Sequence, residues 1–192
     1  MTAAINSSQP SKMLMKQTFL ELYRRKPLSQ ITVREICDAC SLSRTTFYFY
    51  FEDINELYYD CVQDAINYME KDLSGIVLFT VGRDFNRYVE AYNKHLTVLK
   101  ENSELYRILL QGSENISFRE HWFQSIYNHF SQTLSFSKKV DSQLRDSLIR
   151  FFAGGQLNIL TSWVLSGCKI PVNTISYTSA QALFFGVYGN NI

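Results

Sequence analysis

The sequence is poor in residues that break helices. Only three prolines and eight glycines occur among 192 residues, and strand-like alternation of apolar and polar residues is scarce. Apolar residues make up 46% of the chain, which is too large a share for a disordered protein. These features predict an all-α globular protein.

Long hydrophobic runs are also missing. The best candidate, Leu148–Leu165, is interrupted by Arg150, Gln156 and Asn158, so no membrane span is expected. The first twelve residues are polar, show no secretory signal and are expected to be frayed. We therefore expect a cytoplasmic protein without a membrane partner.

Cysteine and histidine are too sparse for a metal site. Cys37 and Cys40 form a lone C-x-x-C pair, Cys61 and Cys168 are isolated, and the three histidines lack helical metal spacing. The cysteines are expected to be small buried side chains. No nucleophile–base pair or phosphate loop is present either. We therefore expect no catalytic residues, no metal and no cofactor, and an enzyme is the least favoured class of function.

Charge is present but unevenly distributed. The net charge is only +1, yet residues 1–51 carry seven Lys/Arg against three acids, a balance of +4. The remaining residues hold twelve basic and fifteen acidic side chains, a balance of −3. A basic amino-terminal segment suits phosphate binding, although a solvated helix face explains each single charge equally well.

The most informative segment is Thr32–Phe51, which predicts two short helices around a tight turn. Thr32 and Glu35 form a T-x-x-E capping box at the start of the first helix. Ser41 and Leu42 make the turn, and Ser43 is a candidate N-cap for the second helix. The first helix has one apolar face, with residues at i, i+3, i+4 and i+7: Val33, Ile36, Cys37 and Cys40.

The second helix is expected to bury Phe47 and Phe51. Its other side chains, Arg44, Thr45, Tyr48 and Phe49, point elsewhere. A further box, Asp53 and Glu56, opens a third helix at Ile54. This is the layout of a helix-turn-helix, in which the second helix enters the major groove of DNA.

These residues resemble the DNA-binding segment of the TetR family of bacterial transcriptional regulators. The family pattern is roughly T-v-x-x-I-a-x-x-a-G-V-S-x-x-T-F-Y-x-H-F-x-D-K-x-x-L, and the resemblance covers about the first third of the chain. The matching residues are Thr32, Ile36, Ser43, Thr46, Phe47, Tyr48, Phe51, Asp53 and Leu57.

Four positions depart from that pattern. Ser41 replaces the turn glycine, so the turn lacks the easy positive φ of Gly. Tyr50 replaces a His, although its phenol still reaches a phosphate, and Ile54 replaces a Lys, which removes one phosphate contact. Phe49 replaces a polar or basic residue. Its side chain either contacts a thymine methyl group or lies on the protein surface.

The resemblance implies two domains and about nine helices. Residues 1–56 would be a three-helix DNA-binding helix-turn-helix domain, and residues 57–192 a larger domain for effector binding and dimerisation. The first helix is expected to end near Lys26, because Pro27 disfavours helix in the residue before it. The helix that begins at Ile54 would be the rigid connector, with Leu73 the last residue of its apolar stripe. Breaks are expected over residues 74–82, 111–115 and 135–139.

The same resemblance implies a set of DNA contacts. Arg44 and Thr45 are the candidates for base contacts, with Phe49 as a further one, because Arg can bridge two acceptors of guanine. Arg34 is a further DNA-binding candidate. The remaining candidates are expected to grip phosphates, which set register rather than sequence: Thr32, Ser43, Thr46, Tyr48 and Tyr50.

An effector pocket and a dimer interface are implied in the larger domain. An aromatic pocket with few charges would favour a flat or hydrophobic ligand, although aromatic residues at helical spacing also suit a plain core. The pocket candidates are Tyr88, Tyr92, His95, Tyr106, Trp122, Phe123 and Tyr127. The interface candidates are Phe151, Phe152, Gly154, Gly155, Trp163, Ala180, Leu183, Phe184 and Val187. Two adjacent glycines in a helix suit the close approach of another helix, although these faces can also pack within one chain.

Three classes of function remain. The favoured one is a homodimeric regulator, a repressor, that binds an inverted repeat in double-stranded DNA and responds to an unidentified small molecule. A dimer suits this function, because two heads can read half-sites about 34 Å apart. The second is a co-regulator of the same fold that acts through a protein partner. The third, an enzyme, has no motif to support it.

Overall fold

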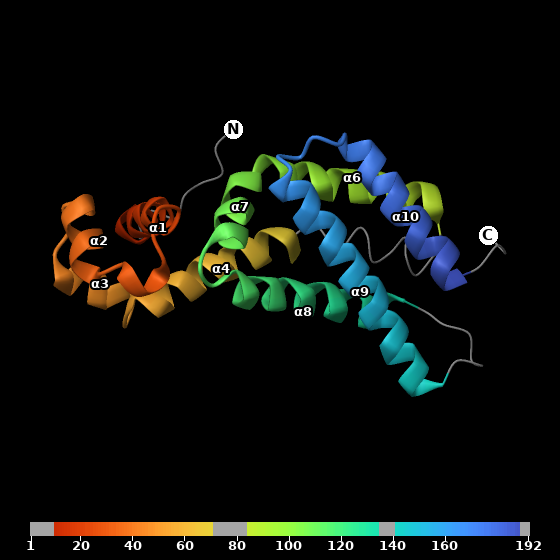
Figure 1. Ribbon diagram of the computed structural model, residues 1–192, viewed down its shortest axis with the longest axis horizontal. Coiled ribbons are helices and arrows are strands. Elements are labelled where there is room, and N and C mark those ends of the chain that lie inside the picture. Colours follow the sequence, from red (N-terminus) through yellow and green to blue (C-terminus); the bar gives the residue numbers. More distant parts are fainter. Residues whose placement is uncertain (1–9, 71–83, 135–140, 189–192) are drawn as a thin grey trace.

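The computed structural model describes residues 10–70, 84–134 and 141–188, and these residues are all-α (Figure 1). They form nine α-helices and one short 3-10 helix, which confirms the predicted fold class. The helices are α1 (Pro10–Tyr23), η1 (Leu28–Gln30), α2 (Val33–Cys40), α3 (Arg44–Tyr50), α4 (Ile54–Glu70), α6 (Phe85–Glu101), α7 (Ser103–Gln111), α8 (Asn115–Thr133), α9 (Ser142–Leu165) and α10 (Val172–Tyr188).

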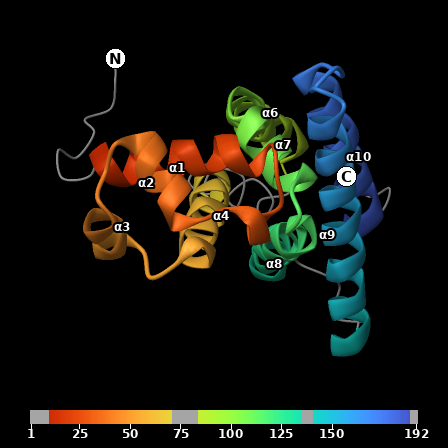
Figure 2. The ribbon, with the colours of Figure 1, turned by 60° about the vertical axis from the view of Figure 1, so that its left-hand side comes forward.

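The helices divide into a small head (residues 10–51), a larger body (α6–α10) and α4 between them. Figure 1 shows α1, α2 and α3 at one end of an elongated molecule, with α4 leading from α3 into the body. Figure 2 shows α9 and α10 on the side away from the head. One hydrophobic core runs from Met15 and Phe19 in the head to Trp122 and Phe184 in the body. A domain boundary near residue 56 therefore stays a prediction.

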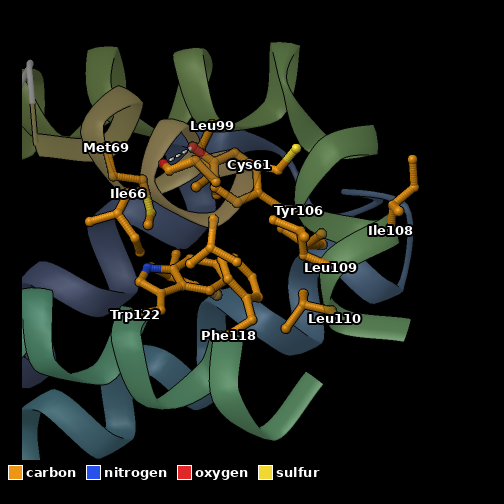
Figure 3. Close-up of a cluster of buried hydrophobic side chains, with 14 of the residues drawn as sticks. Cys61, Ile66, Met69, Leu99, Tyr106, Ile108, Leu109, Leu110, Phe118 and Trp122 are labelled. Carbon is orange, nitrogen blue, oxygen red and sulfur yellow. Dashed lines mark hydrogen bonds between the residues drawn. The ribbon is translucent and has the colours of Figure 1, made fainter. Parts of the chain in front are cut away.

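The apolar stripe of α4 belongs to both ends of this core. Leu57 and Tyr58 are buried near the head, and Ile66 and Met69 are buried in the body. Figure 3 shows Ile66 and Met69 facing Trp122 across the interior of the body. The expected continuation at Leu73 lies outside the described residues.

The predicted helix starts in the head are confirmed. Thr32 Oγ1 accepts the Glu35 N–H at 3.3 Å, and a Glu35 carboxylate oxygen accepts the Thr32 N–H at 3.0 Å. Ser43 Oγ accepts the Thr46 N–H at 3.0 Å at the start of α3. Phe47 and Phe51 are buried, which fixes the inward face of α3.

The start of α4 differs in detail from the predicted box. Asp53 accepts the Glu56 N–H at 2.8 Å, as a helix cap does. The Glu56 carboxylate, however, accepts the N–H of Glu52 and not that of Asp53. The reciprocal bond is therefore displaced by one residue, and the helix still begins at Ile54.

Two predicted helix boundaries were wrong. α1 already begins at Pro10, inside the segment expected to fray, and ends at Tyr23, three residues before Lys26. The chain there tightens into turns in which Leu22 O accepts the N–H groups of both Arg25 and Lys26. Residues 1–9, 71–83 and 135–140 lie outside the described part of the chain, so the breaks predicted at 74–82 and 135–139 are untested. The break at 111–115 is confirmed between α7 and α8.

The last helix, α10, begins at Val172, directly after Pro171. The Pro171 carbonyl accepts the N–H groups of Thr174 and Ile175 at 3.0 and 3.2 Å. The missing N–H of proline costs nothing at a helix start, because that group has no partner within the helix. Gly167, with φ +77°, follows the end of α9.

Two further expectations concern the whole chain. All four cysteines are buried and free, as the small apolar side chains that we expected. Over the described ranges, every helix is too short or too polar to cross a lipid bilayer.

The turn between α2 and α3 generates a stability prediction. Ser41 adopts the left-handed conformation (φ 54°, ψ 40°), which costs a side-chain-bearing residue about 1–2 kcal/mol. Ser41→Gly should therefore raise the free energy of unfolding by about 1 kcal/mol, measured by urea denaturation. The control, Ser29→Gly, changes the same residue type where φ is not positive and should lower stability. Equal effects of the two changes would contradict this explanation.

Candidate nucleic-acid interface

The outer face of α3 carries unusually exposed aromatic side chains. Tyr48 is 58% exposed and Phe49 is 79% exposed, while Arg44 and Thr45 are exposed beside them. Phe49 meets the Tyr50 ring edge-on at 4.9 Å between centroids, which leaves most of its own surface open. The helix therefore presents one cation, one hydroxyl and two aromatic groups outward.

The hydroxyl groups near the helix starts already have partners. The Thr32 hydroxyl contacts the Glu35 carboxylate at 2.9 Å, and the Ser43 and Thr46 hydroxyls lie 2.9 Å apart. Their first role is thus to cap α2 and α3. Any contact that these three groups make with another molecule has to share or replace these bonds.

Nearly all the basic residues of the head are held in ion pairs. Within the part of the chain that the structure describes, Arg44 alone among the seven has no ion pair. The other six pair as Lys12–Asp60, Lys16–Asp60 and Lys16–Asp64, Arg24–Glu104, Arg25–Glu21, Lys26–Glu35 and Arg34–Asp38.

In the folded protein, acidic residues of α4 lie against the basic residues of the head. Asp60 and Asp64 on α4 lie against Lys12 and Lys16 on α1, with 2.7 Å between Lys16 Nζ and Asp60 Oδ2. Burial raises the pKa of Asp60, but the two lysines outweigh it, so its pKa is lowered overall. Residues 52–64 add five acids and no base, which turns the balance of +4 over residues 1–51 into −1 over residues 1–64. The acids of α4 and of the two residues before it therefore offset the basic excess of residues 1–51.

A small cavity of about 40 Å³ lies in the body between α4, α6, α8 and α9. It is large enough for water but not for a drug-sized molecule unless side chains move. Its lining consists of Met69, Tyr88, Tyr92, His95, Trp122, Ser125, Ile126, His129, Phe130, Gln156 and Leu160.

The cavity includes only part of the predicted pocket. Tyr88, Tyr92, His95 and Trp122 line it. Three predicted residues do not: the Tyr106 hydroxyl donates to Ala65 O at 3.0 Å, the Tyr127 hydroxyl donates to Asp146 on α9, and Phe123 stacks on the Tyr127 ring. These three side chains belong to the protein core or surface and not to the lining of the cavity.

Three polar residues of the cavity were not predicted from the sequence: Ser125, His129 and Gln156. Ser125 and His129 follow Trp122 at helical spacing and were recognisable from it, whereas Gln156 comes from a distant helix. The Gln156 amide donates to the Tyr92 hydroxyl, and the Ser125 hydroxyl donates to Glu70 at 2.9 Å. Burial lowers the pKa of His129 to about 4, so this imidazole is neutral at pH 7. Among the residues that the structure describes, no Lys or Arg lines the cavity.

The outward face of α9 is apolar and has heptad-like spacing. Its residues alternate by four and three positions: Leu144, Leu148, Phe151, Gly155, Asn158, Ser162 and Leu165. Phe151 is 73% exposed, and a Cβ added at Gly154 or Gly155 would meet nothing within 4 Å. The close approach expected at these glycines is therefore not made by another described helix of the same chain.

Four predicted interface residues lie inside the chain instead. Trp163 Nε1 donates to Ile170 O at 2.8 Å, and the Phe184 ring lies 5.4 Å from that of Phe85 on α6. Ala180 and Leu183 are buried as well. Ala180, Leu183 and Phe184 lie on α10, which packs against α6, and Trp163 is buried on α9, so these four residues leave the candidate interface. Phe152 is half-buried. The Val187 side chain lies outside the described residues.

Comparisons with known proteins agree with this architecture. The family model TetR_C_8, described as a transcriptional regulator C-terminal region, matches residues 87–182, which is half of the chain. No curated protein sequence matches significantly. The family match and the fold define a transcriptional regulator.

Solved structures resemble the whole chain in fold. One is the dihydroxyacetone kinase operon activator DhaS, with 16% identity over 93% of this chain and 96% of that one (TM-score 0.60). Another is a tetR-family transcriptional regulator from Streptomyces coelicolor, with 16% identity over 91% and 80% (TM-score 0.60). A third is the fatty acid degradation regulator FadR from Bacillus halodurans, with 15% identity over 94% and 98% (TM-score 0.57). The chain belongs to the TetR family of transcriptional regulators.

The imidazole of His129 on the cavity wall generates a pH prediction. Its folded pKa of about 4 lies below the unfolded value of 6.5, so the unfolded chain binds the proton first as the pH falls. Stability should be full above pH 6.5 and should fall by about 2 kcal/mol between pH 6.5 and 4.5. His129→Gln should remove this part of the pH dependence in urea denaturation. His121→Gln, at an exposed site on the same helix, should leave it unchanged.

Proposed function

We propose that this regulator is a homodimeric repressor that reads an inverted repeat in double-stranded DNA and is controlled by a small molecule. The observation that carries the proposal is the outer face of α3. Phe47 holds the helix against the head, while Arg44, Thr45 and Phe49 point away from it. Such a helix can enter the major groove and reach base edges.

Each outward side chain has a specific role in this proposal. Arg44 is the base-reading residue, because its guanidinium is free to bridge two acceptors of guanine. Thr45 reads a neighbouring base, and Phe49 packs on a thymine methyl group. Phosphate contacts come from Tyr48, whose phenol is exposed, and from Arg34, Tyr50, Thr32, Ser43 and Thr46 around the helix starts.

The proposed effector site is the cavity between α4, α6, α8 and α9. Its lining combines aromatic rings with phenols, an amide and imidazoles, and its described residues include no Lys or Arg to hold an acidic group. This chemistry favours a small, flat, uncharged ligand with hydrogen-bonding groups. Because the free cavity is small, ligand entry has to displace side chains of α8 or α4. Met69 on α4 would carry that displacement toward the head.

The main experiment is selection of bound sequences from random duplex DNA by the purified protein. An inverted repeat should be enriched, which would demonstrate both DNA binding and two-fold symmetry. The ion pairing of six of the seven basic residues of the head and the exposed Phe49 specifically favour a second candidate, a co-regulator that acts through a protein partner. That function would yield no enriched duplex, while the protein itself stays folded and dimeric.

The assignment of Arg44 predicts a loss of sequence discrimination. Arg44→Ala should weaken binding to the selected operator by about 1–3 kcal/mol and relax the choice of one base in each half-site. Arg25→Ala removes the same charge from an exposed, paired position in the head, and should change affinity little and equally for all sequences. An Arg44→Ala variant with intact sequence preference in a gel-shift series would rule out this role.

The outer face of α9 predicts the site of dimerisation. We propose an interface made by Phe151, Phe152, Gly154 and Gly155, joined by exposed residues of α10 such as Tyr177 and Phe185. Phe151→Glu should produce monomers in sedimentation equilibrium and abolish tight operator binding, because a charge would be buried without a partner.

The matched control for this variant is Ile116→Glu. Ile116 is 81% exposed on α8, away from the proposed interface, and receives the same charge. Its dimer should persist. Monomers in both variants, or in neither, would contradict the assignment.

A further inference from the structure

The turn between α7 and α8 fits closely against the head. Its first residue, Gly112, lies so near Tyr23 at the end of α1 that any added Cβ would overlap the Tyr23 ring. The Gly112 φ is negative, so this glycine is required by the close approach and not by the backbone conformation. A side chain at residue 112 would push the turn away from α1.

The next two residues of the turn bind three other parts of the chain. Ser113 Oγ accepts the N–H of Leu28 in η1 at 3.0 Å. The Glu114 N–H donates to the Tyr23 hydroxyl at 2.8 Å, and Glu114 O accepts from the Tyr58 hydroxyl at 3.0 Å. Three consecutive residues thus hold α1, η1 and α4 together. We call these contacts the turn clamp.

The two tyrosines of the clamp are rigidly held. Tyr23 and Tyr58 are only 2% and 1% exposed, and their ring centroids lie 5.6 Å apart. Phe19 stacks on Tyr23 at 5.5 Å. Because the rings are fixed by packing, their hydroxyls present hydrogen bonds of fixed direction to the turn.

The clamp connects the head to the helix that lines the cavity. α8 begins at Asn115, directly after the clamp, and carries Trp122 and His129 into the cavity wall. Apart from the exposed Arg24–Glu104 ion pair, the head is attached to the body twice, by the covalent path through α4 and by the turn. Two attachments fix an orientation that a single connector would leave free to rotate.

We propose that Tyr23 and Tyr58 are positioning residues: through the turn clamp they set the angle of each head on its body, and so the distance between the two heads of the dimer. This inference rests on the proposed function as a dimeric operator reader. It adds that tolerance for the spacing between half-sites is determined by residues that do not touch DNA.

The test uses a full-length double variant, Tyr23→Phe/Tyr58→Phe, which keeps both rings and removes the two tyrosine hydroxyls of the clamp. The matched control is Tyr106→Phe. Tyr106 is also a buried tyrosine whose hydroxyl donates to a backbone carbonyl, that of Ala65, but this bond joins α7 to α4 without reaching the head. Both variants thus replace buried tyrosine by phenylalanine, but only the double variant removes hydroxyls of the turn clamp.

The first readout is the affinity ratio between the selected operator and duplexes whose central spacer is one base pair longer or shorter. The wild type and the control should favour the selected spacing by at least about tenfold, as a site with fixed geometry does. The double variant should reduce this ratio to about threefold or less. A merely structural role would lower the affinity for all spacings alike, and a wild-type ratio in the double variant would overturn the proposal.

The second readout does not need DNA. The Leu28 amide donates to Ser113 Oγ, and neither substitution changes Leu28 or Ser113. Its hydrogen exchange should become at least about tenfold faster in the double variant than in Tyr106→Phe, because the turn leaves the head. If the wild type binds no duplex, the proposed function fails, and Leu28 exchange still decides whether the clamp exists. Equal exchange in both variants would overturn it.

Discussion

Burial of one side of α4 in two places is the constraint on which the structure depends. Leu57 and Tyr58 are buried at the head end of the hydrophobic core, while Ile66 and Met69 are buried at its body end. A helix buried at both ends of one core cannot shift at one end without disturbing the other, because packed interiors are stiff. The ion pairs of Lys16 with Asp60 and Asp64 hold α1 to the same helix. The head and the cavity are thus mechanically connected before any ligand is considered.

The use of charge in the head follows from this arrangement. The acids of α4 that anchor α1 also neutralise its lysines, so the head gains internal order at the expense of attraction for phosphate. What remains for recognition is the outer face of α3, with Arg44 as its unpaired cation within the described ranges and Phe49 as its most exposed aromatic side chain. Recognition by shape, hydrogen bonds and methyl contacts fits such a surface better than recognition by bulk charge.

Much of the fold and part of the candidate site were accessible from the sequence, because they rest on local chemistry. The capping residues Thr32 and Ser43, the inward Phe47 and the glycine after α9 each act within a few residues of the chain. The pocket and the interface were predicted less well. Periodicity marks an apolar face but not its partner, so Tyr106, Trp163 and Phe184 were assigned to sites although they fill the core.

The sequence by itself determined the all-α fold, the helix-turn-helix and the outward-facing residues of α3, since spacing and capping specify which side of a short helix is buried. Only the tertiary structure decided the rest. It placed Asp60 and Asp64 beside the basic residues of α1, Gln156 beside Tyr92, and the α7–α8 turn against Tyr23. These pairs lie far apart along the chain, and no local pattern encodes which distant side chains will meet when the helices pack.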